Sequence, residues 1–302
     1  MMLQACSAWA QPNEFSFGVI AGGSAKNANR SGLARAIADT DADNLAFVVA
    51  NGIKSGDEAC SDRLYAERKT MLDEAKNGVI LSLAASDWAN CKKSDGKSAA
   101  VERLSRLREV FFEDEFSLGS TRIPVVRQSS TPKFRSYSEN TRWELDNILF
   151  ATINLPANNN HYLAEAGRNS EFEDRLIANQ DWLQRVFMFA IHKKLDGLVL
   201  FSDGNPFLSA SSAGSENARS KRDGFAETRQ QIARLAAKFP GKVLIVTAQK
   251  SGAPSASSRI IWRNNIGILE AGSGLAKITS DPAASRLFSV SGETVMTKNA
   301  RR

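Results

Sequence analysis

Histidine and cysteine are scarce in this sequence, which limits the metal-binding and nucleophilic chemistry it can carry. The 302 residues include two histidines, His161 and His192, and three cysteines. The cysteines form no Cys-x-x-Cys pair and no cluster with histidine, which argues against a zinc site. Cysteine–histidine catalysis has no supporting local motif either.

Long apolar runs and several common active-site motifs are also missing. Nothing between Phe15 and Val290 approaches the apolar length of a membrane span. The turn Gly22-Gly23-Ser24 lacks the Gly-Lys-Ser/Thr of a P-loop and the third glycine of a dinucleotide fingerprint, so it is a weak indication of an anion site. No Gly-x-Ser-x-Gly elbow occurs.

The overall composition is that of a globular protein with a basic surface. Hydrophobic residues make up 42% and charged residues 24%, and the net charge is +6. The basic residues are scattered and do not alternate with aromatics, so we expect no nucleic acid as partner. The partner that we expect is an unidentified protein or a small anionic ligand. Without an internal repeat or linker, residues 15–302 are predicted to form a single domain.

Residues 1–14 are interpreted as a signal-peptide remnant, with a disordered tail as the alternative. Ala8-Trp9-Ala10 is similar to the small-x-small end of a secretory signal, although the basic and long apolar regions are absent. Leu3-Gln4-Ala5-Cys6 loosely resembles a lipoprotein acylation box, but five residues before the cysteine are too few for export. We therefore expect a periplasmic or secreted protein, with a cytoplasmic one as the alternative.

Strands and helices alternate along the first half, which predicts a parallel sheet covered by helices. The predicted strands are residues 15–21, 45–50 and 79–83, and the predicted helices lie at 31–37, 61–76 and 101–112. Asp146-Asn147 predicts a hairpin, followed by a long helix at 172–194, a strand at 198–201, a loop at 209–220, a helix at 225–239 and a strand at 243–246. Short runs after residue 259 favour a second, more antiparallel sheet.

Two cysteines follow predicted neighbouring strands and would lie at the same edge of the sheet. Cys60 comes after the second strand and Cys91 after the third. A disulfide between them is geometrically feasible and suits an oxidising compartment. The alternative is a pair of unpaired structural thiols in a cytosolic protein, which the spacing alone does not exclude.

Six segments, taken in order, resemble a bacterial branch of the calcineurin-like metallophosphoesterases. They are residues 45–49 (LAFVV), 53–56 (IKSG), 87–91 (DWANC), 102–112 (ERLSRLREVFF), 150–154 (FATIN) and 158–160 (NNN). The similarity covers about residues 15–250. It implies an α/β fold of two packed mixed sheets flanked by helices, a four-layer α/β/β/α sandwich with its site at the carboxyl ends of the strands.

Members of this family hold two divalent metal ions that activate a water and clamp a phosphate. The positions matching their ligand motifs carry other residues here. They are Gly22 and Ser24 after the first strand, Asn51 and Gly52 after the second, Ala84, Ala85, Ser86 and Asp87 after the third, Ser202, Asp203 and Gly204 after the strand at 198–201, and Thr247, Ala248, Gln249, Lys250 and Ser251 at the last motif. The resemblance therefore implies a vestigial pocket without metal, and no cofactor is expected.

Several polar residues near this edge remain open to two interpretations. Asp87 can bind a cation or be a turn aspartate, and Asp203 is a site residue or part of ordinary turn chemistry. Lys250 can attract an anion or be a solvated lysine. The run Asn158-Asn159-Asn160 can donate to a ligand or form a polar loop. His161 can border the edge, whereas His192 is expected on the surface of the long helix or packed against it.

The function expected from these features is that of a catalytically inactive metallophosphoesterase homologue, a pseudo-phosphatase that acts as a binding or scaffold protein. The alternative is a weak or atypical metal-dependent phosphoesterase that uses Asp87, Asp203 and His161.

Overall fold

The computed structural model describes residues 13–21, 30–164, 167–208, 222–248, 259–272 and 274–291. Its helices are α1 (Arg30–Asp41), α2 (Asp62–Asp73), α3 (Ala100–Phe111), α4 (Ser170–Lys193) and α5 (Ala226–Ala236). Its strands are β1 (Phe15–Ala21), β2 (Val48–Asn51), β3 (Val79–Ser82), β4 (Val126–Arg127), β5 (Thr141–Leu145), β6 (Ile148–Thr152), β7 (Gly197–Ser202), β8 (Lys242–Ala248), β9 (Ile261–Arg263), β10 (Ile266–Ala271), β11 (Leu275–Ser280) and β12 (Phe288–Val290).

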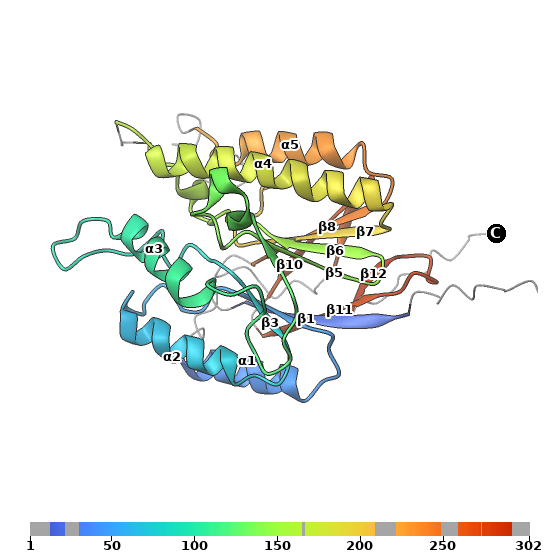
Figure 1. The fold of residues 1–302 in the computed structure, drawn as a ribbon, viewed down its shortest axis with the longest axis horizontal. Coiled ribbons are helices and arrows are strands. Elements are labelled where there is room, and N and C mark those ends of the chain that lie inside the picture. Colours follow the sequence, from blue (N-terminus) through green and yellow to red (C-terminus); the bar gives the residue numbers. More distant parts are fainter. Residues whose placement is uncertain are drawn as a thin grey trace, which may run out of the picture.

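The strands form two mixed sheets that pack face to face (Figure 1). The five-stranded sheet has the order β12-β11-β1-β2-β3, and the seven-stranded sheet has the order β4-β5-β6-β7-β8-β10-β9. Helices α1, α2 and α3 lie on the outer side of the first sheet, and α4 and α5 cover the second. This confirms the predicted α/β fold of two packed mixed sheets flanked by helices.

The alternation of side chains along each strand explains why the sheets stack. In β2, Val49 faces the core between the sheets and Val48 faces the helices. The inner core is rich in aromatic rings: Phe47 and Phe150 have centroids 4.8 Å apart, and Trp143 stacks on Phe201 at 5.9 Å. Strands with large apolar side chains on both faces are typical of sheets buried on both sides.

The described strands after residue 259 are divided between the two sheets and do not form one antiparallel sheet, so that expectation was wrong. Strands β9 and β10 join the seven-stranded sheet, while β11 and β12 join the five-stranded one. Strand β11 lies antiparallel to β1, with Phe15 opposite Ser280. The last four strands are therefore divided equally between the two sheets. Each sheet has an edge strand with unpaired main-chain groups, and a new strand forms hydrogen bonds by pairing with that edge.

The hairpin follows the predicted turn chemistry, and a serine side chain caps the start of α2. Asp146 adopts a φ of 49° between β5 and β6, and Ser61 accepts a bond from the Leu64 N–H at the start of α2. Helix α2 ends at Asp73 rather than near Lys76. Gly78 lies against a later loop, where a Cβ would be 2.7 Å from the Thr121 carbonyl oxygen.

Candidate functional site

The carboxyl ends of the parallel strands of both sheets meet at one edge of the molecule, where the sequence resemblance places the site. Asn51, at the end of β2, donates from Nδ2 to the Ser202 carbonyl oxygen at the end of β7, over 2.9 Å. Both residues are 1% exposed. The two sheets are therefore joined directly at this edge by a buried hydrogen bond.

Asp203 makes a second link between the sheets. Its Oδ2 accepts the Ala85 N–H at 2.7 Å, from the turn after β3, and the Ala157 N–H at 2.8 Å, from the segment after β6. The side chain is buried, and this burial raises the pKa of Asp203 above its ordinary value. The two N–H donors lower the pKa, but by less than burial raises it. One carboxylate oxygen thus fixes main-chain groups of two different loops.

Asp87 has a comparable role inside the turn after β3. Its Oδ1 accepts the Ile53 N–H at 3.0 Å and its Oδ2 accepts the Ala84 N–H at 2.8 Å. The residue is fully buried, and this burial raises the pKa of Asp87 to about 7, against the two N–H donors and the charge of Lys54. Both oxygens are engaged by the main chain, as in a structural turn aspartate.

Lys54 is a buried cation next to this turn that the sequence did not single out. Its Nζ donates to the carbonyl oxygens of Ser55 at 2.7 Å and Ser86 at 2.9 Å, and Ser86 Oγ donates back to the Lys54 carbonyl at 2.9 Å. Burial lowers the pKa of Lys54, while the charges of Asp87 and Glu58 act against that change. The cation is thereby tied to two loops and held at 1% exposure.

A disulfide joins Cys60 and Cys91, with their Cα atoms 5.8 Å apart. It connects the segment after β2 to the turn after β3. The phenol of Tyr65, on α2, donates to the Asp87 carbonyl at 2.7 Å and lies 3.8 Å from Cys91 Sγ. The covalent link and the buried phenol hold the same turn that carries Asp87.

His161 lies beside this turn but is bound to a carboxylate of its own. Its Nδ1 is 3.0 Å from Glu171 Oε2, and its ring meets Trp88 edge-on at a centroid distance of 4.9 Å. Burial would raise the pKa of Glu171, but the Arg175 charge and bonds from His161 and Arg175 outweigh it and bring the value to about 2. Glu171 is therefore a carboxylate held ionised by its neighbours.

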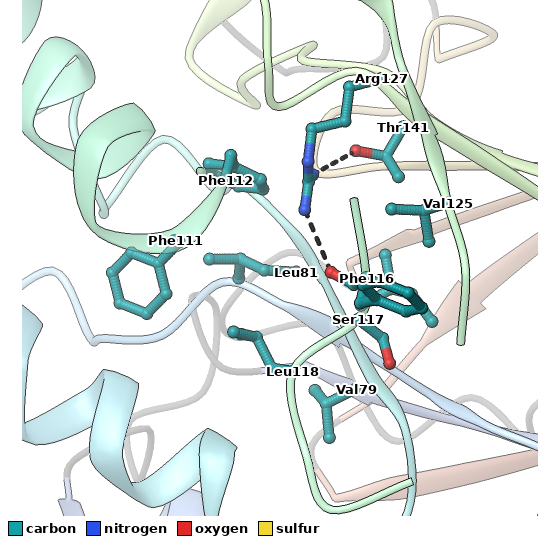
Figure 2. A pocket seen from close by; sticks show the side chains of 11 residues that line it. Val79, Leu81, Phe111, Phe112, Phe116, Ser117, Leu118, Val125, Arg127 and Thr141 are labelled. Carbon is teal, nitrogen blue, oxygen red and sulfur yellow. Dashed lines mark hydrogen bonds between the residues drawn. The ribbon is translucent and has the colours of Figure 1, made fainter. Parts of the chain in front are cut away.

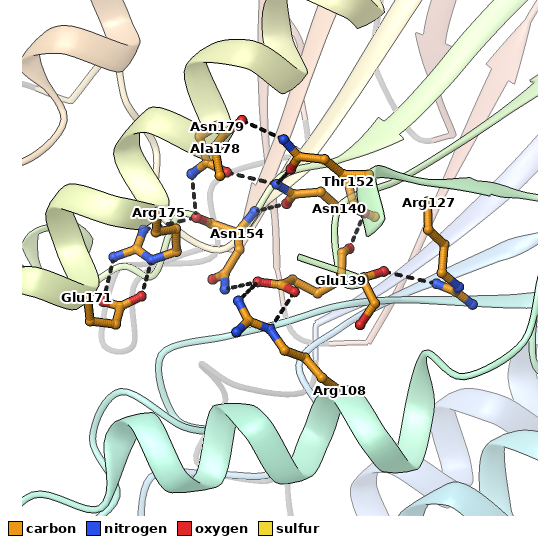
Figure 3. A network of polar contacts seen from close by, with 12 residues as sticks. Arg108, Arg127, Glu139, Asn140, Thr152, Asn154, Glu171, Arg175, Ala178 and Asn179 are labelled. Atoms are coloured by element: carbon orange, nitrogen blue, oxygen red, sulfur yellow. Dashed lines mark hydrogen bonds and ion pairs between the residues drawn. The ribbon is translucent and has the colours of Figure 1, made fainter. Parts of the chain in front are cut away.

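The buried arginines of this region belong to a larger polar network (Figure 3). Arg175 also donates to the Asn154 and Asn160 carbonyl oxygens, and Arg108 on α3 makes two bonds to Glu139, of 2.8 and 2.6 Å. Asn154 Nδ2 donates to the same Glu139 carboxylate at 3.0 Å. Arg108 and Arg175 are thus each paired with a glutamate, and these ion pairs fix loops and helices.

The remaining predicted residues divide into buried main-chain positions and positions outside the described structure. Gly52 has a φ of 85° and donates its N–H to the Ser82 carbonyl, and Ala85 and Ser86 are 6% exposed. His192 is exposed on α4, as expected. Gly22, Ser24, Gln249, Lys250 and Ser251 lie outside the described residues, as do residues 1–12 and 209–221.

The donor groups that the structure describes at this edge do not fit a pair of divalent metal ions. Among the described residues, no group of three or more His, Cys, Asp and Glu side chains is arranged to hold a metal. Three of the four carboxylate oxygens of Asp87 and Asp203 already accept main-chain N–H bonds. Asn51 Oδ1 and Ser82 Oγ, on neighbouring strands, are buried without a partner in the described part, and neutral oxygens are weak substitutes for anionic ligands.

No protein-family model matches the chain, and no curated protein matches it. A search of the described helices finds none with the length and apolarity needed to cross a membrane.

Sequence reasoning found Asp87 and Asp203 because they follow strands, but it missed Lys54, Glu139, Glu171 and Arg175. Glu171 and Arg175 stand four residues apart at the start of α4, a spacing that favours an ion pair on a helix. The sequence therefore contained a recognisable signal for the Glu171–Arg175 ion pair. Nothing in the sequence alone indicated that Arg108 would reach Glu139 from another layer of the fold.

Proposed function

We propose that this protein is a non-catalytic relative of the metallophosphoesterases, a pseudo-phosphatase that acts as a binding or scaffold protein of the cell envelope. The observation that carries the proposal is the use made of the two carboxylates at the strand ends. Asp87 and Asp203 are 0% and 3% exposed, and each accepts two main-chain N–H bonds.

Hydrolysis of a phosphate ester needs more than these groups can supply. In metal-dependent hydrolysis, two ions lower the pKa of the attacking water and neutralise the charge on the phosphate oxygens. A general base alone contributes about 10²–10⁴-fold, whereas phosphate monoesters require far more. A base must also reach the water it activates, and Asp87 lies beneath the surface with both oxygens occupied.

The envelope location rests on a separate observation. A disulfide such as Cys60–Cys91 persists in oxidising compartments and is rare in the reducing cytosol. The disulfide joins the loops after β2 and β3. In an exported protein it would hold these two loops together at the carboxyl ends of the strands without a metal ion.

The proposal is tested by metal analysis and phosphatase assay on the full chain purified from an oxidising compartment. We expect no stoichiometric Mn, Fe, Zn or Mg, and no hydrolysis of an aryl phosphate above the blank, with or without added Mn²⁺. Gly52→Asp, which restores one carboxylate, should not create activity because the other ligand positions stay empty.

The opposite result has a clear form. One or two tightly bound metal ions per chain, with turnover that copurifies with the folded protein and disappears in Asp87→Ala or Asp203→Ala, would overturn the proposal. Arg185→Gln, which breaks only an exposed helix ion pair with Asp181, is the matched control and should behave like the wild type.

A further inference from the structure

We draw no further inference here: the strongest candidate, the crevice between strand β3, the end of helix α3 and strand β4 that Arg127 lines (Figure 2), has room for about one water molecule, and nothing in the described structure shows a free N–H of Arg127 facing that space.

Discussion

Glu171 illustrates how a carboxylate in this protein is used for structure. It bonds to His161 and to Arg175 at 3.0 and 2.6 Å, and these groups bring its pKa from an ordinary 4.5 to about 2. A group whose pKa is depressed on folding adds stability above its unfolded pKa and loses it as the pH falls through the folded pKa. The contribution of Glu171 should therefore be complete above about pH 5 and disappear toward pH 2.

Glu171→Gln should consequently lower the free energy of unfolding by roughly 3 kcal/mol at pH 7, since one pKa unit corresponds to about 1.4 kcal/mol. The difference from the wild type should shrink steadily between pH 5 and pH 2. Urea unfolding across this pH range measures it. Glu67→Gln, on the exposed side of α2, is the control and should change the stability by less than about 0.5 kcal/mol. A difference independent of pH would contradict the assignment.

The candidate site shows what a sequence reveals about single residues. Asp87 and Asp203 were identifiable because strand ends of a parallel sheet share one edge. Whether their oxygens face a ligand or the main chain depends on loops that approach from other strands, as the Ala157 N–H approaches Asp203. Lys54 resembled an ordinary surface lysine, because only the tertiary structure places the Ser86 carbonyl over its ammonium group.

At the scale of elements, local signals predicted the first half of the fold well. The apolar runs at β1, β2 and β3 and the helical spacing of Leu104 and Leu107 need no distant partner to be recognised. The short strands after residue 259 were assigned to the wrong arrangement, because a strand of three to six residues carries no information about its partner. Which sheet β11 joins is settled by the exposed edge of β1, far away in the sequence.

The disulfide is the strongest constraint between neighbouring elements. It closes a chain segment with a sequence separation of 31 residues, which corresponds to roughly 3–4 kcal/mol of loop entropy removed from the unfolded state. Cys60→Ser combined with Cys91→Ala should lower the free energy of unfolding by about that amount. Dithiothreitol should destabilise the wild type similarly and leave the double variant unchanged. An unfolding midpoint insensitive to reduction in the wild type would contradict this.

For the whole molecule, the contacts at the strand ends predict that the two sheets unfold as one unit. Asn51 bonds to Ser202, Asp203 bonds to Ala85, and the aromatic rings of Phe47 and Phe150 interlock between the sheets. Hydrogen exchange followed by mass spectrometry should therefore give β2 and β7 the same opening free energy, and urea unfolding should show a single transition with all probes.

A variant of the joint tests this cooperativity directly. Asn51→Ala with Asp203→Ala leaves the N–H groups of Ala85 and Ala157 and the Ser202 carbonyl without partners, at a cost of about 4 kcal/mol in total. Because the sheets share one core, the loss should appear equally in peptides from both. Asn158→Ala, which removes only an exposed bond to Asn90, should cost less than about 1 kcal/mol. Protection lost from one sheet alone would show that each sheet is stable without the other, and that the buried carboxylate at their junction does not couple them.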